Sequence, residues 1–204
     1  MTRLIYNNVK KTKPAVNMKI AITGGIGSGK SYVCRLLEKR GIEVYDCDAA
    51  AKRLMRLSDD LRRALTELIG PDAYVDDVLQ KKVIARFLLA DHRNAEALNN
   101  VVHPVVARDF MASGKDWIET AILFDSGFHR RISPDRVVCV TAPIEVRLDR
   151  IMVRDGLTRS QAQAWIQRQM PQDEVAGLSD YVIENDGMQS LDNQIDNILN
   201  KIYN

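Results

Sequence analysis

The feature that most constrains the fold is a short glycine-rich stretch, "GGIGSGKS", at residues 24–31. An apolar run at residues 18–23 precedes it, and apolar residues at helical spacing follow over residues 31–40. We therefore expect a buried strand, a tight loop and a helix in succession. Glycines let backbone amides approach a bound group closely, and the start of a helix carries partial positive charge. A loop of this kind favours a negatively charged group, above all phosphate.

The same stretch matches the P-loop pattern G-x-x-x-x-G-K-S at every required position. In such a loop Lys30 reaches the β- and γ-phosphates of a nucleoside triphosphate, and the Ser31 hydroxyl binds Mg²⁺. The dinucleotide-binding pattern fails because its last glycine would fall on Lys30, and the chain has no N-K-x-D guanine motif. We therefore expect ATP and Mg²⁺ at this loop. The loop residues expected to bind ATP are Gly25, Ile26, Gly27, Ser28, Gly29, Lys30, Ser31 and Tyr32.

The bulk composition is that of an ordinary globular protein and argues against several classes of function. The 204 residues include 29 Lys and Arg against 27 Asp and Glu, and the net charge of +2 is too small to favour a nucleic-acid surface. No stretch reaches the roughly 20 apolar residues of a membrane span. Three separated cysteines, Cys34, Cys47 and Cys139, are typical of reduced, buried thiols. We expect a cytoplasmic protein that binds small molecules, as a monomer or weak homo-oligomer.

Strand and helix patterns alternate along most of the chain, which predicts an α/β fold with a mostly parallel sheet covered on both faces. Residues 1–17 are polar and basic, and we expect them to form a flexible tail before the first strand. The expected strands are 18–23, 42–46, 117–122, 136–141 and 181–184. Besides 31–40, the expected helices outside the middle of the chain are 144–155, 160–170 and 191–202.

Residues 49–113 break this alternation, because apolar residues there recur only at helical spacing. We expect helices around the leucines between 54 and 68, over 79–89 and over 104–113, with Pro104 in the first turn of the last one. A helical stretch this long between two strands is interpreted as an insertion that receives a second substrate. The expected domain then has its core at 18–48, 114–146 and 171–204, the insertion at 49–113 and a helical lid at 147–170.

Acidic residues stand where two expected strands end. Asp46 and Asp48 would point the same way at the carboxyl edge of the sheet, where open α/β sheets bind ligands. Asp48 could accept the proton of an attacking hydroxyl, or it could equally cap the helix that follows. Glu119 and Asp125, near the end of the strand at 117–122, are candidate Mg²⁺ ligands, although Asp125 could instead cap a turn.

Arg147, Arg150 and Arg154 share one face of an expected helix, and Arg159 and Arg168 follow further along. A charged helix face is most often only solvated. Beside a phosphate-binding loop, however, arginines on a closing lid can neutralise the charge that develops on a transferred phosphoryl group. We therefore expect Arg147 and Arg154 to act in catalysis and Arg150 to bind ATP.

Several further motifs occur in a fixed order after "ITGGIGSGKS". They are "GIEVYDCDAAAKRL", "HPVV", "ETAILFDSGF", "RIMVRDGLTRSQAQAWIQRQM" and "SDYVIENDG". In this order they are similar to the D-x-D segment, acceptor-side loop, lid and closing strand of the dephospho-CoA kinase family, and the resemblance runs from residue 18 to the C-terminus. It implies a three-layer P-loop NTPase fold and transfer of the ATP γ-phosphate to the ribose 3′-hydroxyl of dephospho-CoA, the last step of coenzyme A synthesis.

The resemblance also implies roles for individual residues. Asp48 matches the family's base for the 3′-hydroxyl, and residues 49–113 correspond to the part that receives dephospho-CoA. Another nucleotide or small-molecule kinase of the P-loop fold, or a nucleotide-gated binding protein, is the alternative. The residues that would pass near the adenine of ATP are Asn185, Asp186 and Gly187.

Three positions depart from the family's pattern. Tyr32 stands where threonine is usual, which should be tolerated because Ser31 supplies the hydroxyl for the metal. Ala121 stands where proline is usual and Asp125 where glutamate is usual, both in the acceptor-side loop. His103 matches a His-Pro pair of the family, but its sequence context indicates no particular chemistry.

Overall fold

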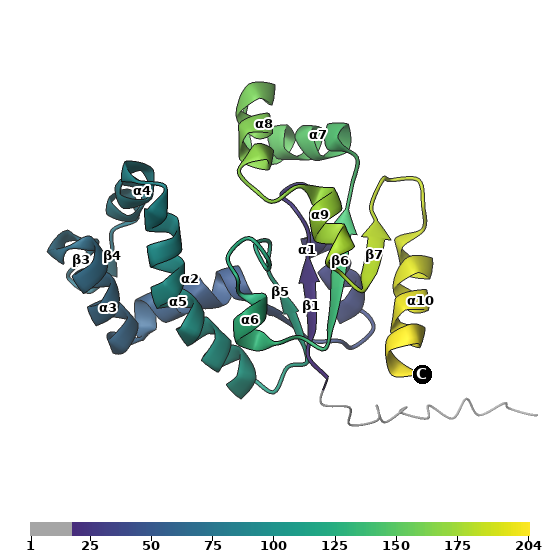
Figure 1. Ribbon diagram of the computed structural model, residues 1–204, viewed down its shortest axis with the longest axis horizontal. Coiled ribbons are helices and arrows are strands. Elements are labelled where there is room, and N and C mark those ends of the chain that lie inside the picture. The colour runs from purple at the N-terminus through teal and green to yellow at the C-terminus, as the bar shows by residue number, and fades with distance from the viewer. Residues whose placement is uncertain (1–17) are drawn as a thin grey trace, which may run out of the picture.

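The computed structural model describes residues 18–204, so the expected tail at residues 1–17 lies outside the described residues. Figure 1 shows three parts: a central sheet with helices on both faces, an arm of helices on one side, and a helical pair above the upper ends of the strands. None of the helices in residues 18–204 has both the length and the apolar character that crossing a membrane requires.

The central sheet has five strands, all parallel, in the order β2-β5-β1-β6-β7. They are β1 (Ile20–Thr23), β2 (Val44–Asp46), β5 (Trp117–Glu119), β6 (Arg136–Thr141) and β7 (Tyr181–Glu184). Because β1 is central, the glycine-rich loop that follows it emerges in the middle of the carboxyl edge of the sheet. This confirms the predicted α/β fold.

Helices cover the sheet on both faces and so produce the expected three layers. Ile20 and Ile22 of β1 point to one face and Ala21 to the other, as the alternation of a strand requires. One face is covered by α1 (Lys30–Glu38) and α10 (Leu191–Tyr203), and the other by α2 (Cys47–Leu57), α5 (Arg93–Ala112) and α6 (His129–Ile132), while α3 (Asp59–Ile69) packs on α2 and α5 in the arm.

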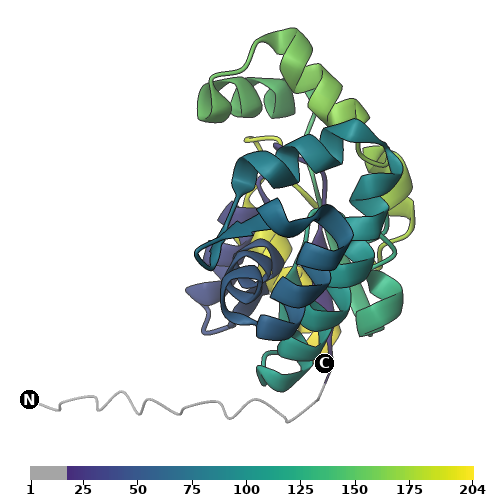
Figure 2. The ribbon, with the colours of Figure 1, turned by 90° about the vertical axis from the view of Figure 1, so that its left-hand side faces the viewer.

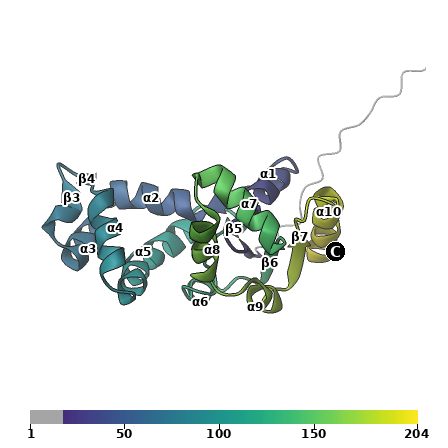
Figure 3. The same ribbon diagram turned by 90° about the horizontal axis from the view of Figure 1, so that it is seen from above.

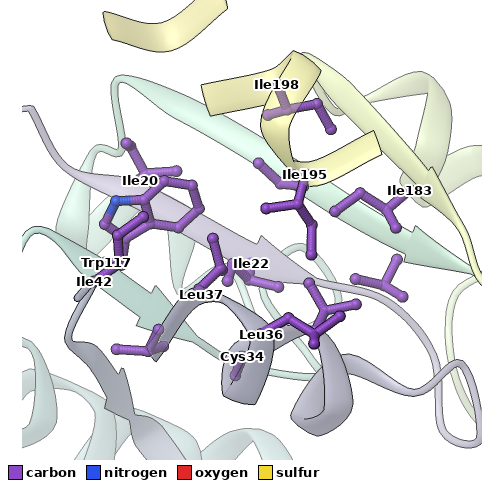
Figure 4. Close-up of a cluster of buried hydrophobic side chains, with 14 of the residues drawn as sticks. Ile20, Ile22, Cys34, Leu36, Leu37, Ile42, Trp117, Ile183, Ile195 and Ile198 are labelled. Atoms are coloured by element: carbon purple, nitrogen blue, oxygen red, sulfur yellow. The ribbon is translucent and has the colours of Figure 1, made fainter. Parts of the chain in front are cut away.

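The core beneath α1 and α10 fixes the base of the glycine-rich loop. Figure 4 shows Leu36 and Leu37 of α1 and Ile195 of α10 gathered on Ile22 of the central strand. The Trp117 indole nitrogen donates a hydrogen bond to the Tyr203 hydroxyl at 2.9 Å, which holds the last helix against β5. Because the packed helices cover this face of the sheet, the carboxyl edge is the part that remains open to a ligand.

The arm differs from the purely helical insertion that the sequence pattern predicts. After a short 3-10 turn (Pro71–Ala73), β3 (Tyr74–Val75) and β4 (Val78–Leu79) form a two-stranded antiparallel hairpin, and α4 (Lys81–Ala90) follows. The hairpin turn places Asp76 at φ 47° and Asp77 at φ 64°, a conformation that aspartate adopts more readily than most residues. The expectation of helices alone was wrong because four strand residues leave almost no periodic signal.

The position predicted for Pro104 is also wrong. This proline lies inside α5, which begins eleven residues earlier at Arg93, and not in a first turn. The buried residues Val102, Val106 and Phe110 continue one helix face across it. Packing of that face against α2 and α3 therefore outweighs the loss of one backbone hydrogen bond at the proline.

The helical pair comprises α7 (Ile144–Asp155) and α8 (Arg159–Gln167), packed on each other through Leu148, Ile151 and Ala162. In Figure 2 the pair lies above the rest of the molecule, and Figure 3, seen from above, places it over β5 and β6 between the arm and α10. A short helix that the sequence did not predict, α9 (Gln172–Gly177), leads back to β7.

Candidate functional site

A cavity of about 720 Å³ opens at the carboxyl edge of the sheet. Its walls come from the glycine-rich loop, the end of β2, the start of α2, the end of β5 and α7. Of the residues predicted for the site, the following line it: Ile26, Gly27, Gly29, Lys30, Ser31, Tyr32, Asp48, Glu119, Arg150 and Arg154. Residues from four distant parts of the chain thus meet at the place where such sheets bind ligands.

The start of α1 is open toward this cavity. The helix begins at Lys30, and no side chain caps its first turn. Gly29 precedes it in the left-handed conformation, with φ 93°, which glycine adopts at no steric cost. The first amides of a helix need acceptors, so this end of α1 presents donors and partial positive charge to an anion.

Two glycines are also required because their neighbours come so close. A Cβ atom at position 27 would lie 2.7 Å from the carbonyl oxygen of Arg147. A Cβ atom at Gly29 would overlap the side-chain amide of Asn185. The loop is therefore pressed between α7 on one side and the turn after β7 on the other.

Lys30 lies inside the loop that surrounds it. Its Nζ donates to the carbonyl oxygen of Gly24 at 2.6 Å and lies 3.9 Å from Oε1 of Glu119. Burial lowers the pKa of Lys30, and the charge of Glu119 opposes this effect. The ammonium group is thus held within the loop by a backbone oxygen and a nearby carboxylate.

Glu119 ends β5 and lies beside Asp46, its partner in the strand register. Burial raises the pKa of Glu119 to about 7, and the positive charge of Lys30 limits this rise while Asp48 and Asp46 add to it. A carboxyl group with a pKa this close to neutral pH would ionise readily beside a further cation.

The two aspartates that follow β2 have different environments. Asp46 caps α2, since its side chain accepts a hydrogen bond from the amide of Ala49 at 2.9 Å. Asp48 lies in the first turn and makes no hydrogen bond or ion pair within residues 18–204, so the capping role considered for it belongs to Asp46. Asp48 is exposed and lines both the large cavity and a second, smaller one. Its carboxylate is free to face a ligand.

The smaller cavity has a volume of about 170 Å³ and lies under the arm, between α2, α5 and the loop after β5. Most of its lining is apolar, with Asn99, Thr120 and His103 as polar groups. His103 packs against Phe128 with their ring centroids 4.8 Å apart, and burial, aided by the charge of Arg131, lowers the pKa of His103 to about 4. This histidine is therefore neutral at physiological pH.

The three arginines of α7 do not act alike. The buried Arg147 donates from Nε to the carbonyl oxygen of Ile26 at 2.9 Å and does not line the cavity. Arg150 donates to the carbonyl oxygens of Gly27, Ser28 and Asn185. Arg154 lines the cavity and forms an ion pair with the neighbouring Asp155. The first two support the loop, while the third faces the ligand space.

The turn after β7 also supports the loop. The Asn185 side-chain amide donates to the carbonyl oxygen of Ser28 at 2.8 Å, from a buried position. The Asp186 carboxylate accepts from the amides of Met188 and Gln189 and so shapes the turn. Gly187 has φ 86°, which suits a glycine in that turn.

One residue of the site, Gln169, escaped the sequence analysis, and Asp125 makes a contact other than the metal or turn-capping contact considered for it, without lining the cavity. Gln169 lines the cavity, and its Oε1 accepts a hydrogen bond from the amide of Ile26 at 2.7 Å. Asp125 accepts from the amide of Met170 at 2.8 Å, so it joins the loop after β5 to the end of the helical pair. Nothing in the sequence marks Gln169, because a single glutamine at a helix end has no distinguishing pattern.

The oxygen donors at the loop fit Mg²⁺. The Ser31 hydroxyl and the Glu119 carboxylate line the same cavity. Within residues 18–204 no group of three or more His, Cys, Asp or Glu side chains could by itself hold a metal ion. Mg²⁺ in phosphate-transferring sites is bound by one or two protein oxygens together with phosphate oxygens and water, so a small donor set of this kind is sufficient.

Comparison with known proteins agrees with this site. The model of the family described as dephospho-CoA kinase matches residues 18–190. A dephospho-CoA kinase of Bacteroides fragilis is 36% identical over 193 residues, which cover 91% of this chain and 93% of that one.

Two solved structures show the same fold. The crystal structure of TT1252 from Thermus thermophilus has a TM-score of 0.77 at 33% identity, covering 92% of this chain and 98% of that one. Dephospho-CoA kinase from Campylobacter jejuni has a TM-score of 0.62 at 19% identity, covering 91% of this chain and 96% of that one, and it supports the fold alone. The chain has the fold of P-loop kinases, and it belongs to the dephospho-CoA kinase family.

Proposed function

We propose that this protein transfers the γ-phosphate of ATP to the 3′-hydroxyl of dephospho-CoA, giving CoA and ADP. The observation that carries the proposal is the position of Asp48 on the wall shared by two cavities. One cavity contains the P-loop and suits a triphosphate, and the other is mostly apolar and suits the nucleoside of an acceptor. A hydroxyl presented at Asp48 would lie between them.

On the ATP side, the amides at the start of α1 bind the phosphate chain and Lys30 binds the β- and γ-phosphates. Arg150 keeps the loop in shape through its three carbonyl contacts, and Arg154 approaches the phosphates from α7. Arg147, which holds Ile26 from below, serves the reaction by positioning the loop. These donors are arranged before the substrate binds, which is what stabilises charge in a transition state.

On the acceptor side, Asp48 orients the 3′-hydroxyl toward the γ-phosphorus. As the new oxygen–phosphorus bond forms, the bond to the β-phosphate oxygen breaks, ADP leaves, and the hydroxyl proton passes to Asp48. Because the transition state of phosphoryl transfer is loose, alignment contributes more than the strength of the base. A carboxylate without another hydrogen-bond partner is suited to both tasks.

We propose that Mg²⁺ is held by Ser31 and Glu119 together with the phosphates. Bound there, the metal would neutralise charge on the β- and γ-phosphate oxygens. Such a cation would favour ionisation of Glu119, whose pKa is about 7.

We place the enzyme in the cytoplasm, and the cysteines support this. Cys34, Cys47 and Cys139 are all buried and unpaired with one another. Burial also raises the pKa of each thiol, so none is a reactive thiolate. Unpaired thiols are the usual state of cysteine in a reducing compartment.

A coupled assay of ADP release tests the function against its alternatives. Dephospho-CoA, AMP and shikimate would be supplied in parallel with ATP-Mg, with ATP-Mg alone as the control. Release that depends on dephospho-CoA, with ³¹P NMR showing a new 3′-phosphate, is the expected result. Preference for another acceptor would make the protein a different kinase of this fold, and slow release without any acceptor would favour a nucleotide-gated binding protein.

A further inference from the structure

A third cavity, of about 480 Å³, extends the site along α2 toward the hairpin of the arm. It shares Ala49 and Lys52 with the phosphate-binding cavity, so the two are adjacent. We call it the α2–hairpin groove. Its charged lining consists of Lys52, Arg53, Arg56, Lys81 and Asp77.

The groove carries positive charge that the protein does not neutralise. Its acidic residue, Asp77, is paired with Arg62 from outside the lining, and Arg53 is paired with Asp109. Lys52, Arg56 and Lys81 form no ion pair within residues 18–204. Three uncompensated cations around one cavity favour a ligand with at least two negative charges.

The groove also has apolar lining. Met55, Val78 and Leu79 line it, and the Val78 side chain is 62% exposed although it lies in a strand. Exposed apolar side chains beside uncompensated cations suit a ligand that is anionic at one end and less polar at the other.

The helix sets the distance between the groove and Asp48. Asp48, Lys52 and Arg56 are spaced four residues apart and lie along one side of α2. At a rise of about 1.5 Å per residue, Lys52 is about 6 Å and Arg56 about 12 Å along the helix axis from Asp48. A ligand whose hydroxyl lies at Asp48 would therefore place a group a few ångströms away among the cations.

We propose that the α2–hairpin groove binds the 5′-diphosphate of the acceptor, and that Val78 and Leu79 contact the pantetheine arm. The inference rests on the proposed function, since dephospho-CoA carries both a ribose hydroxyl and a diphosphate joined to a long, weakly polar arm. The P-loop serves the phosphates of ATP, so the groove accounts for the second set of phosphates in the ternary complex. It makes the enzyme select acceptors by their diphosphate as well as by their hydroxyl.

A pair of charge reversals on α4 tests the groove. Lys81→Glu should raise the KM for dephospho-CoA about tenfold or more, because a charge-assisted contact is replaced by repulsion. The KM for ATP should stay unchanged, and kcat should stay within about twofold. Lys82→Glu is the matched control, since Lys82 is the next residue, is also exposed and does not line the groove. A glutamate in the first turn suits the helix dipole, so α4 should keep its structure.

Direct binding gives a second measurement. Calorimetric titration of dephospho-CoA without ATP should show weaker binding to the Lys81→Glu and Arg56→Gln variants than to the wild type and to Lys82→Glu. Higher ionic strength should weaken binding more in the wild type than in Lys81→Glu. If Lys81→Glu and Lys82→Glu changed KM and binding equally while the wild type still phosphorylates dephospho-CoA, the role proposed for the groove would be wrong. If the wild type transferred nothing to dephospho-CoA, the proposed function itself would fail.

Discussion

Asp48 shows how much one residue's role depends on its neighbour. Two aspartates spaced two residues apart at the end of a strand can each cap the following helix or act as a base. The backbone conformation determines which of them takes which role. Here the chain enters α2 at Cys47, so Asp46 takes the capping amide and Asp48 is left facing the cavities. Under the proposed mechanism, helix capping falls to Asp46 and proton acceptance to Asp48.

Replacing Asp48 tests the catalytic half of this division. Asp48→Asn keeps the shape and removes the proton acceptor, so kcat should fall about 100-fold or more. The affinity for ATP should remain unchanged, because Asp48 is not among the groups that contact the triphosphate. Steady-state kinetics with dephospho-CoA and calorimetry with a non-hydrolysable ATP analogue measure the two quantities. A kcat near that of the wild type would remove Asp48 from the mechanism.

His103 gives the protein a pH dependence of stability that can be isolated. Its pKa is about 4 in the folded protein against an ordinary value of 6.5, so the unfolded chain takes up its proton first as pH falls. The contribution of neutral His103 to stability is therefore complete above pH 6.5 and is lost as pH falls toward about 4. Allowing for its partial exposure, we expect a loss of about 2 kcal/mol.

Urea unfolding of the wild type and of His103→Gln between pH 4 and pH 8 measures this contribution. The free energy of unfolding of the wild type should fall relative to that of the variant only below about pH 6.5. Parallel curves for the two proteins would show that His103 titrates normally in the folded state.

At the scale of elements, α7 and the glycine-rich loop form one unit. Arg147 and Gln169 bind the carbonyl and the amide of Ile26, from the start and the end of the helical pair, and Arg150 binds the next two carbonyls. The shape of the loop therefore depends on the position of the pair, and movement of α7 would alter phosphate binding.

A conservative substitution on α7 tests this coupling. Arg150→Lys keeps the charge but loses the guanidinium group whose two terminal nitrogens bind the carbonyl oxygens of Gly27, Ser28 and Asn185. Because the loop is then less well held, the KM for ATP should rise about tenfold. The KM for dephospho-CoA should change little. Arg159→Lys is the control, because Arg159 pairs with the exposed Glu145 and makes no contact with the loop among the interactions of residues 18–204. The idea fails if the two lysine variants bind ATP equally well.

At the scale of the whole molecule, ligand binding should be visible as stability. ATP-Mg at about 100 times its dissociation constant should add about 2.7 kcal/mol to the free energy of unfolding, which raises Tm by roughly 5–10 °C for a domain of this size. Lys30→Ala should lose both the shift and the activity, since its ammonium group is the principal cation of the loop. A thermal melt of the two proteins, each with and without ATP-Mg, makes the comparison, and a full shift in the variant would contradict the role given to Lys30.

The overall fold could be predicted from sequence because its signals are long or chemically specific. The loop pattern fixed one strand and one helix, and the remaining strands are apolar runs that a buried parallel sheet requires. The hairpin at Tyr74–Leu79 could not be predicted, since its strands are two residues each. The helix across Pro104 was missed because long-range packing overrode a local breaker.

The site could be predicted only in part, for a related reason. Lys30, Ser31 and Asp48 follow strands directly, so local pattern places them at the carboxyl edge. The supporting contacts of Arg147, Gln169 and Asn185 are made between segments more than 100 residues apart. Spacing along the chain therefore suggested that Arg147, Arg150 and Arg154 all act on the ligand, whereas in the fold Arg147 and Arg150 bind the backbone of the loop.

The junction between β2 and α2 has a mechanical consequence. The strand ends at Asp46 and the helix starts at Cys47, with no connecting residue to absorb a change of direction. A swing of the arm that turned α2 about this junction would displace Asp48 little, because Asp48 lies in the first turn of the helix. The far end of the helix would move the most. Under the proposed mechanism, the arm could therefore close on a large acceptor while Asp48 keeps its position relative to the triphosphate.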